Sequence, residues 1–497
     1  MKILLSIIVC FPLLGSAQLR MGKIFSDNMV LQRDKPVHVW GKAAPGSTVR
    51  VTFAGEERNS LVRTDASWDV YFSKQKANTR PQSIIVLSGN EKIEFSNILI
   101  GDIWICFGQS NMEFPMRKEM HFRQEVSGTD QPLIRFYNPW FAGKYVFGKL
   151  FTDSARKRMN AQDFFQGQWQ RCDSNTVKEM SAIGYYFAKE IATQENIPVG
   201  MINLSIGGAP IETFISRKTL ASDDRFASKV QGDWLNDDAL PVWARQRGKE
   251  NIGTDNDTDP SGPAHPFKPG FAYASGIEPI LGLPVRGMLW YQGESNSQEL
   301  PRVKEYGELL KLLITDYRRK WREPRMPFYW VQLSSIDTTG YQSRYWPEFR
   351  NEQRKLLGSV NHGGMAVCSD IGFKNDVHPT DKKTVGERLS RWALNGTYKE
   401  NIIPSGPLPL RAKYKEGNII IAFRYAGNGL KTPGDQKVSG FSLDGTADAP
   451  ATIKKRAIII PSQYRPEYIY YGWKPFSDGN LYNSDMLPAS TFKIKVQ

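Results

Sequence analysis

Cysteine is scarce in this sequence, with four residues among 497. Cys10 falls in a segment expected to be removed, which leaves Cys106, Cys172 and Cys368. Three cysteines allow one disulfide at most, for which Cys106 and Cys172 are the pair to test, and three buried thiols are an equally good expectation. The sequence also lacks the cysteine and histidine spacing of a zinc site, so we expect no metal and no cofactor.

Long apolar runs are missing after the first residues. No later segment has the ~20 uninterrupted apolar residues that a membrane helix needs, so no membrane insertion is expected. Residues 1–17 have the pattern of a signal peptide, with the charged Lys2, the apolar run from Ile3 to Leu14 and the small-residue cleavage site Gly15-Ser16-Ala17. The sequence therefore predicts a mature protein that begins near Gln18 and is secreted or periplasmic.

The charge pattern argues against nucleic acid as a partner. The formal net charge is +14, but the lysines and arginines are dispersed along the chain. Export would also keep the protein away from nucleic acid. The excess of positive charge is expected to form a solvated basic surface, and the alternative is that it attracts an anionic glycan.

Short β-rich runs broken by turns occur at both ends of the chain. Residues 18–97 contain runs such as Val37–Trp40 and Thr48–Phe53 at regular spacing, which is typical of an antiparallel sandwich. This pattern predicts an N-terminal immunoglobulin-like β-sandwich domain. Similar runs return in residues 400–497, for example at Ile419–Phe423, and predict either a second β-sandwich-like domain or strands that complete the first.

The central residues 98–399 alternate between strand and helix patterns. Residues 177–192 carry an apolar stripe with helical spacing, and the buried strand pattern 198–204 follows it. Such alternation predicts an α/β domain with a parallel sheet covered on both faces. The stretch 251–266 is polar and rich in Gly, Asp and Pro, so we expect a surface excursion near the active site.

Four segments that follow buried strands carry the residues capable of chemistry. Ligand sites of open α/β sheets lie outside the carboxyl ends of their strands. The strand at 103–107 leads into Ser110 at a helix start, where a serine is placed as a nucleophile or simply as a helix cap. The second segment holds two glycines, Gly207 and Gly208. The third holds an amide and a carboxylate, Gln292 and Glu294, and the fourth holds His378 with acidic neighbours.

These segments resemble the four conserved blocks of the sialate O-acetylesterase family within the SGNH hydrolases. The blocks occur in the family's order as Gly108–Glu113, Gly207–Glu212, Trp290–Asn296 and Asn375–Pro379. The resemblance implies a flavodoxin-like, three-layer hydrolase core at 98–399. It also implies an enzyme that removes O-acetyl groups from carbohydrates.

The residue chemistry supports a serine esterase mechanism. Ser110 would attack the acetyl carbonyl after His378 takes its proton. The oxyanion would be bound by three kinds of donor: the Ser110 N–H, an N–H at Gly207 or Gly208, and the Gln292 side-chain amide.

The sequence departs from the wider SGNH pattern at two positions. Gln292 stands where that group has asparagine, with Asn296 as a less favoured substitute. Asn375 stands where that group has aspartate, so the group that orients His378 is open. The candidates are Asp376, which we favour, then Asp370 and Glu294, or a backbone carbonyl.

The substrate and the alternative functions are also open. Both sialate and plant polysaccharides such as xylan or pectin are open as substrates, and sialate would need a carboxylate clamp, usually arginine. Glu113 and Glu294 are expected to be buried carboxylates that bond strand-end amides. The competing functions are a non-catalytic carbohydrate-binding protein and a lipase-like esterase, which would need an apolar lid. The side chains considered for substrate contacts are Arg117, Arg135 and Arg344 for a carboxylate, and Trp140, Trp290, Tyr291, Trp346 and Trp473 for sugar stacking.

Overall fold

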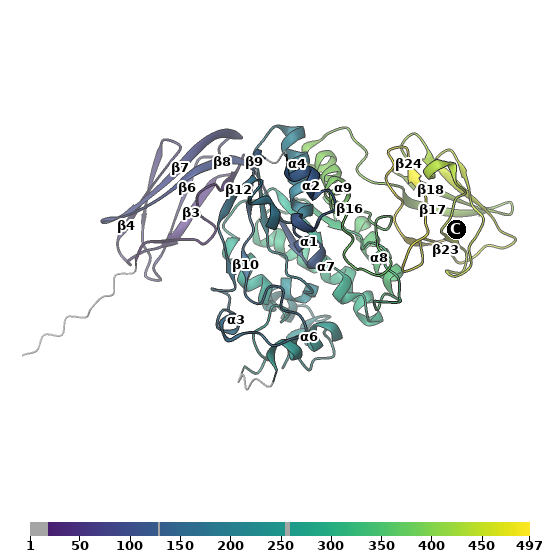
Figure 1. Ribbon diagram of the computed structural model, residues 1–497, viewed down its shortest axis with the longest axis horizontal. Helices are drawn as coiled ribbons and strands as arrows, with labels where there is room; N and C mark the ends of the chain where they lie inside the picture. The colour runs from purple at the N-terminus through teal and green to yellow at the C-terminus, as the bar shows by residue number, and fades with distance from the viewer. Residues whose placement is uncertain (1–17, 128–129, 254–258) are drawn as a thin grey trace, which may run out of the picture.

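The computed structural model describes residues 18–127, 130–253 and 259–497 (Figure 1). The predicted signal peptide and part of the predicted surface excursion lie outside these residues. Within the described ranges, no helix is both long enough and apolar enough to cross a lipid bilayer.

A mixed sheet forms the centre of the molecule. Six of its seven central strands are parallel, and the edge strand β12 runs antiparallel to β9. The prediction of a parallel sheet is therefore wrong for this edge strand, because the chain reverses direction between β9 and β12. In spatial order the strands are β12 (Trp169–Asp173), β9 (Asp130–Tyr137), β13 (Val199–Asn203), β8 (Glu91–Gly108), β14 (Gly287–Tyr291), β15 (Phe328–Val331) and β16 (Gly363–Ala366).

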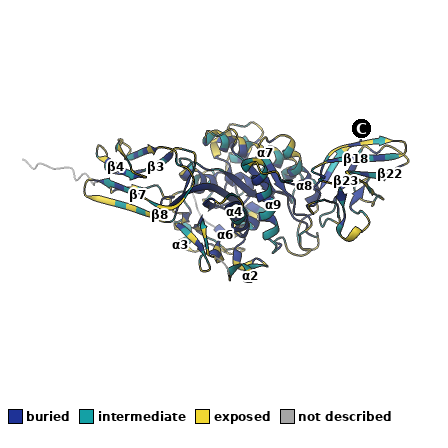
Figure 2. Cartoon of the chain, turned by 90° about the horizontal axis from the view of Figure 1, so that it is seen from above, coloured by how far each residue is buried: buried dark blue, intermediate teal, exposed yellow. Residues whose placement is uncertain are grey.

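Helices cover both faces of this sheet. On β8, Trp104 packs edge-on against Phe187 of α4 (Ala182–Glu195). Phe107, three residues later and therefore on the opposite face, stacks on Tyr317 of α7 (Leu300–Lys320). α9 (Lys383–Ala393) packs beside α4, and α8 (Trp346–Lys355) packs beside α7 (Figures 1 and 2).

Strand β8 joins the N-terminal region to the core. Its first half alternates between exposed and half-buried residues, whereas residues 98–108 are buried throughout. The domain boundary predicted between residues 97 and 98 falls inside this strand. The N-terminal strands are antiparallel apart from β2, which is parallel to β8: β1 (Arg20–Met21), β2 (Val30–Gln32), β3 (Val37–Lys42), β4 (Thr48–Phe53), β5 (Glu56–Leu61), β6 (Ser67–Phe72) and β7 (Asn78–Ser88).

The C-terminal strands form a separate β region with its own apolar core. Its buried side chains include Ile419, Ile458 and Phe492. In the described part of the chain these strands pair with one another and not with β1–β8, so they do not complete the N-terminal sheets. The longer ones are β17 (Leu408–Lys415), β18 (Asn418–Arg424), β22 (Ala457–Pro461), β23 (Tyr468–Tyr471) and β25 (Phe492–Lys495).

The three described cysteines are free and buried. The considered disulfide between Cys106 and Cys172 is not formed. Cys106 lies on β8 and Cys172 on β12, three strand positions away in the order β12-β9-β13-β8. At roughly 4.8 Å between neighbouring strands, this separation is well beyond the reach of a disulfide. Burial raises the pKa of both thiols to about 12.

Candidate active site

Ser110 begins α1 (Ser110–Glu113), a single helical turn directly after β8. The tight connection depends on Gly108, whose φ is +127°. A Cβ at this glycine would lie 2.1 Å from the backbone oxygen of Tyr291 on β14, so no other residue fits. The sequence thus turns sharply at the carboxyl end of the sheet and presents the serine hydroxyl there.

Ser110 and His378 lie within hydrogen-bond distance, although 268 positions separate them. His378 Nε2 is 2.8 Å from Ser110 Oγ. On the other side of the ring, Nδ1 is 3.2 Å from Asp376 Oδ1, and the same oxygen accepts the His378 backbone N–H at 2.8 Å. The three side chains therefore have the relative positions that a nucleophile, a base and an orienting acid would need.

The surroundings of His378 favour the neutral imidazole that a general base requires. Burial lowers its pKa below the usual value, and the nearby Lys382 ammonium lowers it further. Asp376 acts in the opposite direction by stabilising the protonated ring. The Asp376 side chain is 58% exposed, so water screens this effect.

The other two candidates for the acid are engaged elsewhere. Both Asp370 oxygens accept hydrogen bonds from Arg388, at 2.6 and 2.7 Å. Glu294 accepts a hydrogen bond from the Asn111 side chain at 2.6 Å and is buried. Among the candidates in the described residues, Asp376 is the one placed against the imidazole.

A buried network joins the turn that carries Ser110 to the loop that carries His378. The Asn111 side-chain amide donates to Glu294 Oε1 at 2.6 Å and to the backbone oxygen of Val377 at 2.9 Å. Lys382 Nζ donates to Asn111 Oδ1 at 2.5 Å. Burial raises the pKa of Glu294 to about 7 and lowers the pKa of Lys382 to about 7.

Two of the expected oxyanion donors lie beside the nucleophile. The Ser110 N–H is in the first turn of α1, where amides have no partner within the helix. A Cβ at Gly207 would lie 3.8 Å from Ser110 Cβ, so the backbone of Gly207 approaches the serine closely. Gly208 follows with φ of +75°, which places this backbone in a conformation that favours glycine.

The structure corrects the expectation for Gln292. Its side chain is fully buried, and its amide nitrogen is within hydrogen-bond distance of Asn296 Oδ1, Gln109 Oε1 and the Ala209 backbone oxygen. Asn296 is likewise engaged, since it accepts from the Ile211 N–H and donates to Glu212. These amides therefore hold the strand-end loops together and do not point into the active-site cavity.

The cavity at Ser110 and His378 has a volume of about 320 Å³. Polar and aromatic residues share its lining, which also includes Glu113, Lys118, Tyr145, Phe147 and Gly207. Glu113 is buried beside the Gly207 N–H and 3.4 Å from Lys144 Nζ. Burial raises the pKa of Glu113, and Lys144 and the Gly207 N–H partly oppose this rise.

Comparisons with known proteins point to carbohydrate acetylesterases. The family described as "Carbohydrate esterase, sialic acid-specific acetylesterase" matches residues 274–395. Human sialate O-acetylesterase is 27% identical over 421 residues, which cover 78% of this chain and 73% of the human protein. The rat protein is 25% identical over 450 residues, covering 82% of this chain and 79% of its own.

One solved structure matches almost the whole chain. The crystal structure of a carbohydrate acetylesterase from Xanthomonas citri has a TM-score of 0.78 and 27% identity, and the match covers 96% of this chain and 99% of that one. The chain is therefore similar, in sequence and in fold, to carbohydrate acetylesterases that include the sialate O-acetylesterases. This match extends over the described α/β core and both flanking β regions, because it covers nearly the full length of both chains.

Most of the considered aromatic and arginine side chains of the esterase lie away from the cavity. Trp290, Tyr291 and Trp346 are fully buried and belong to the core. Arg135 is buried and donates to nearby backbone oxygens. Arg344 packs against Tyr345, and Trp473 packs against Tyr470. The exceptions are Trp140 and Arg117, which contact Tyr145 on the cavity lining.

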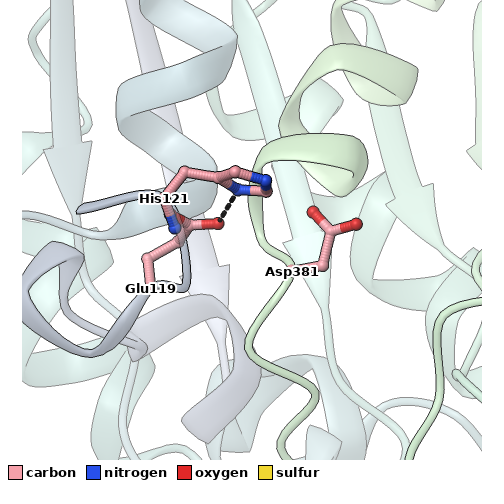
Figure 3. Close-up of side chains that lie close together, drawn as sticks. All are labelled: Glu119, His121 and Asp381. Atoms are coloured by element: carbon pink, nitrogen blue, oxygen red, sulfur yellow. Dashed lines mark hydrogen bonds and ion pairs between the residues drawn. The ribbon is translucent and has the colours of Figure 1, made fainter. Parts of the chain in front are cut away.

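One group of side chains in the described part of the esterase has the composition of a metal site. Ligand atoms of Glu119, His121 and Asp381 lie within 4.8 Å of one another (Figure 3). Glu119 Oε1 is 2.9 Å from His121 Nδ1, and Oε2 accepts hydrogen bonds from the His121 N–H and the Tyr186 hydroxyl. Both Glu119 oxygens already have hydrogen-bond partners. We therefore assign this group a structural role, in which it stabilises residues 119–121 next to the loop after His378.

Two residues of the site were missed from the sequence. In the sequence, Asn111 is one polar residue of the block around Ser110, and Lys382 lies outside all four blocks. Lys382 stands four residues after His378, where a lysine is usually an exposed charge, yet its side chain is buried. No pattern in the sequence marks it, because its partners come from distant segments.

Proposed function

We propose that this protein is an exported serine esterase that removes O-acetyl groups from carbohydrates through an acetyl-serine intermediate. The observation that carries the proposal is the 2.8 Å contact between Ser110 Oγ and His378 Nε2 at the edge of a cavity. A purely carbohydrate-binding protein would have no need for this pair.

The first half of the reaction acylates Ser110. As Oγ bonds to the acetyl carbonyl carbon, His378 Nε2 takes the hydroxyl proton. The resulting imidazolium is stabilised by Asp376 at Nδ1. The tetrahedral intermediate then collapses, the bond between the acetyl carbon and the sugar oxygen breaks, and His378 returns the proton to that oxygen.

The second half releases acetate. A water molecule takes the place of the sugar, gives a proton to His378 and attacks the acetyl carbon of the ester on Ser110. Collapse of this second intermediate breaks the bond to Oγ, and the serine regains its proton from His378. Acetate leaves and the site returns to its starting state.

The negative charge of both intermediates needs fixed donors. We assign this role to the N–H of Ser110 and an N–H at Gly207 or Gly208; the Gly207 N–H also bonds to Glu113, whereas its backbone lies beside Ser110. Loss of one such donor typically lowers the rate by ~10²–10³.

The experiment is acetate release from O-acetyl sialate and from acetylated xylan or pectin oligomers, with wild-type protein, Ser110→Ala and His378→Ala. We expect the wild type to release acetate from at least one of these carbohydrates and both variants to lose the activity. The relative rates decide between sialate and plant polysaccharides. Absence of acetate release from all of them would refute the esterase proposal.

A further inference from the structure

Aromatic side chains that face solvent gather at the mouth of the active-site cavity. Trp140 is 50% exposed, Tyr145 39% and Phe147 53%. Tyr145 and Phe147 line the cavity that holds Ser110 and His378, and Trp140 lies against Tyr145 with ring centroids 5.7 Å apart. We call these three side chains the aromatic wall. Large apolar surfaces left in water at a cavity mouth are a mark of a binding site.

Buried and partly buried cations hold the wall in place. Lys144 Nζ lies 5.1 Å from the Trp140 ring and 5.2 Å from the Tyr145 ring, and its side chain is almost fully buried. Arg247 lies 5.9 Å from the Phe147 ring and 4.7 Å from that of Trp243. These cation–π contacts fix the rings in the free protein, so binding does not have to order them.

Lys144 also connects the wall to the nucleophile. Its ammonium is 3.4 Å from Glu113, the last residue of the helical turn that begins with Ser110. The orientation of the rings relative to the serine hydroxyl is therefore set by one short chain of contacts. A ligand that lies on the wall is held next to the reacting hydroxyl.

We propose that the aromatic wall binds the sugar ring of the acetylated substrate while its acetyl group enters the cavity at Ser110. A pyranose ring has an apolar face of C–H groups that fits a ring, and hydroxyls at its edge that need polar partners. Lys118 and Thr380 on the cavity lining, and the Arg117 guanidinium beside the Tyr145 hydroxyl, supply such partners. The inference rests on the proposed esterase function and adds the surface that selects a carbohydrate over a simple acetate ester.

The test separates sugar binding from acetyl transfer. Binding of O-acetyl sialate and of an acetylated xylo-oligosaccharide is measured by titration calorimetry on Ser110→Ala, which cannot consume them. Adding Trp140→Ala or Phe147→Leu to this background should weaken binding of the preferred saccharide about three- to tenfold, the effect of one aromatic ring contact. Phe147→Tyr keeps the ring and should restore the affinity.

Kinetics on Ser110-containing variants give the second readout. Ethyl acetate carries the reacting group without a sugar ring. Phe147→Leu and Trp140→Ala should lower kcat/KM for the acetylated saccharide at least about threefold more than for ethyl acetate. Tyr464→Ala, an equally exposed aromatic in the C-terminal β region, serves as the control and should change neither.

The outcomes distinguish this proposal from the esterase proposal. Unchanged saccharide affinity in both ring-removing variants, or equal losses on saccharide and ethyl acetate, would overturn the sugar-binding role. A greater loss on long-chain acyl esters than on saccharides would assign the wall to lipids and overturn it as well. If the wild type hydrolyses no ester at all, the esterase proposal fails, and the calorimetry still decides whether the wall binds sugar. Trp140 is half exposed, so Trp140→Ala should fold normally. It therefore provides the test if Phe147→Leu fails to fold.

Discussion

The Asn111 side-chain amide donates a hydrogen bond to the backbone oxygen of Val377 over 2.9 Å. Asn111 directly follows Ser110, and Val377 directly precedes His378. This one bond therefore fixes the turn that carries Ser110, the proposed nucleophile, against the loop that carries His378, the proposed base. Lys382 and Glu294 hold the same amide from two other sides.

Asn111→Ala is expected to loosen the contact between the segments that carry Ser110 and His378. The substitution removes the bond to Val377 and leaves buried Glu294 and Lys382 without this partner. We expect kcat to fall about 10²-fold and the free energy of unfolding to fall by about 1–3 kcal/mol. Steady-state kinetics and urea denaturation check both effects. A variant with normal kcat would show that the bond does not position His378.

The buried Glu294 carboxyl predicts a pH-dependent stability. Its pKa is about 7 in the folded protein and about 4.3 in an unfolded chain. The folded state thus binds the proton more tightly, and this contribution to stability is lost as pH rises from about 4.3 through about 7. Relative to wild type, Glu294→Gln should gain up to about 3 kcal/mol of unfolding free energy across this window.

Denaturation at about pH 5, 6 and 7 measures this difference between Glu294→Gln and wild type. Lys382 contributes mainly at higher pH, because its pKa is lowered to about 7 from an ordinary value of about 10.4. Its effect has the opposite sign, since stability rises with pH between those two values. A constant difference between variant and wild type from about pH 5 to 7 would refute the raised pKa of Glu294.

Asp376→Asn tests the exposed acid. The carboxylate raises the pKa of His378, so its loss should move the acidic limb of the kcat/KM profile to lower pH. The carboxylate is largely solvated, and we expect a loss of about 10–100-fold, well below that for His378→Ala. Asp370→Asn, whose carboxylate pairs with Arg388, is the matched control and should leave the profile in place. A larger shift in the control would reassign the acid.

Gln292→Met distinguishes a structural amide from an oxyanion donor. The amide nitrogen lies near acceptors on Gln109, Asn296 and Ala209, so its removal should destabilise the fold by about 1–3 kcal/mol. An oxyanion donor would instead lower kcat by ~10²–10³ and leave the unfolding free energy unchanged. Thermal unfolding measured beside kinetics separates the two results.

Much of the core organisation could be predicted because its strands are marked by short patterns of neighbouring residues. The buried strands at 103–107 and 199–203 consist of apolar residues and glycine apart from the terminal Asn203, and glycine and small polar residues come soon after each. The resemblance in four ordered blocks then singled out Ser110 and His378, which the structure brings together. Their assignment as nucleophile and base stays a proposal until it is measured.

The rest depends on contacts that a sequence does not display. The antiparallel direction of the edge strand β12 depends on where the chain reverses, which the strand's own residues do not show. The polar pair Ser96-Asn97 resembles a strand end, although β8 continues through it. The direction of the Gln292 amide is set by acceptors more than eighty positions away as well as by nearby Asn296. Burial of Lys382 likewise depends on Asn111, which lies 271 positions earlier.

The most direct test of the account is to identify the acylated residue. Wild-type protein is mixed with an acetylated substrate, quenched in acid during turnover and digested for mass spectrometry. We predict an acetyl group on Ser110, its absence in Ser110→Ala, and a loss of acetate release in that variant on the order of 10⁶-fold. Acetate release by Ser110→Ala at the wild-type rate, or a turnover-dependent acetyl group on another residue, would contradict the account.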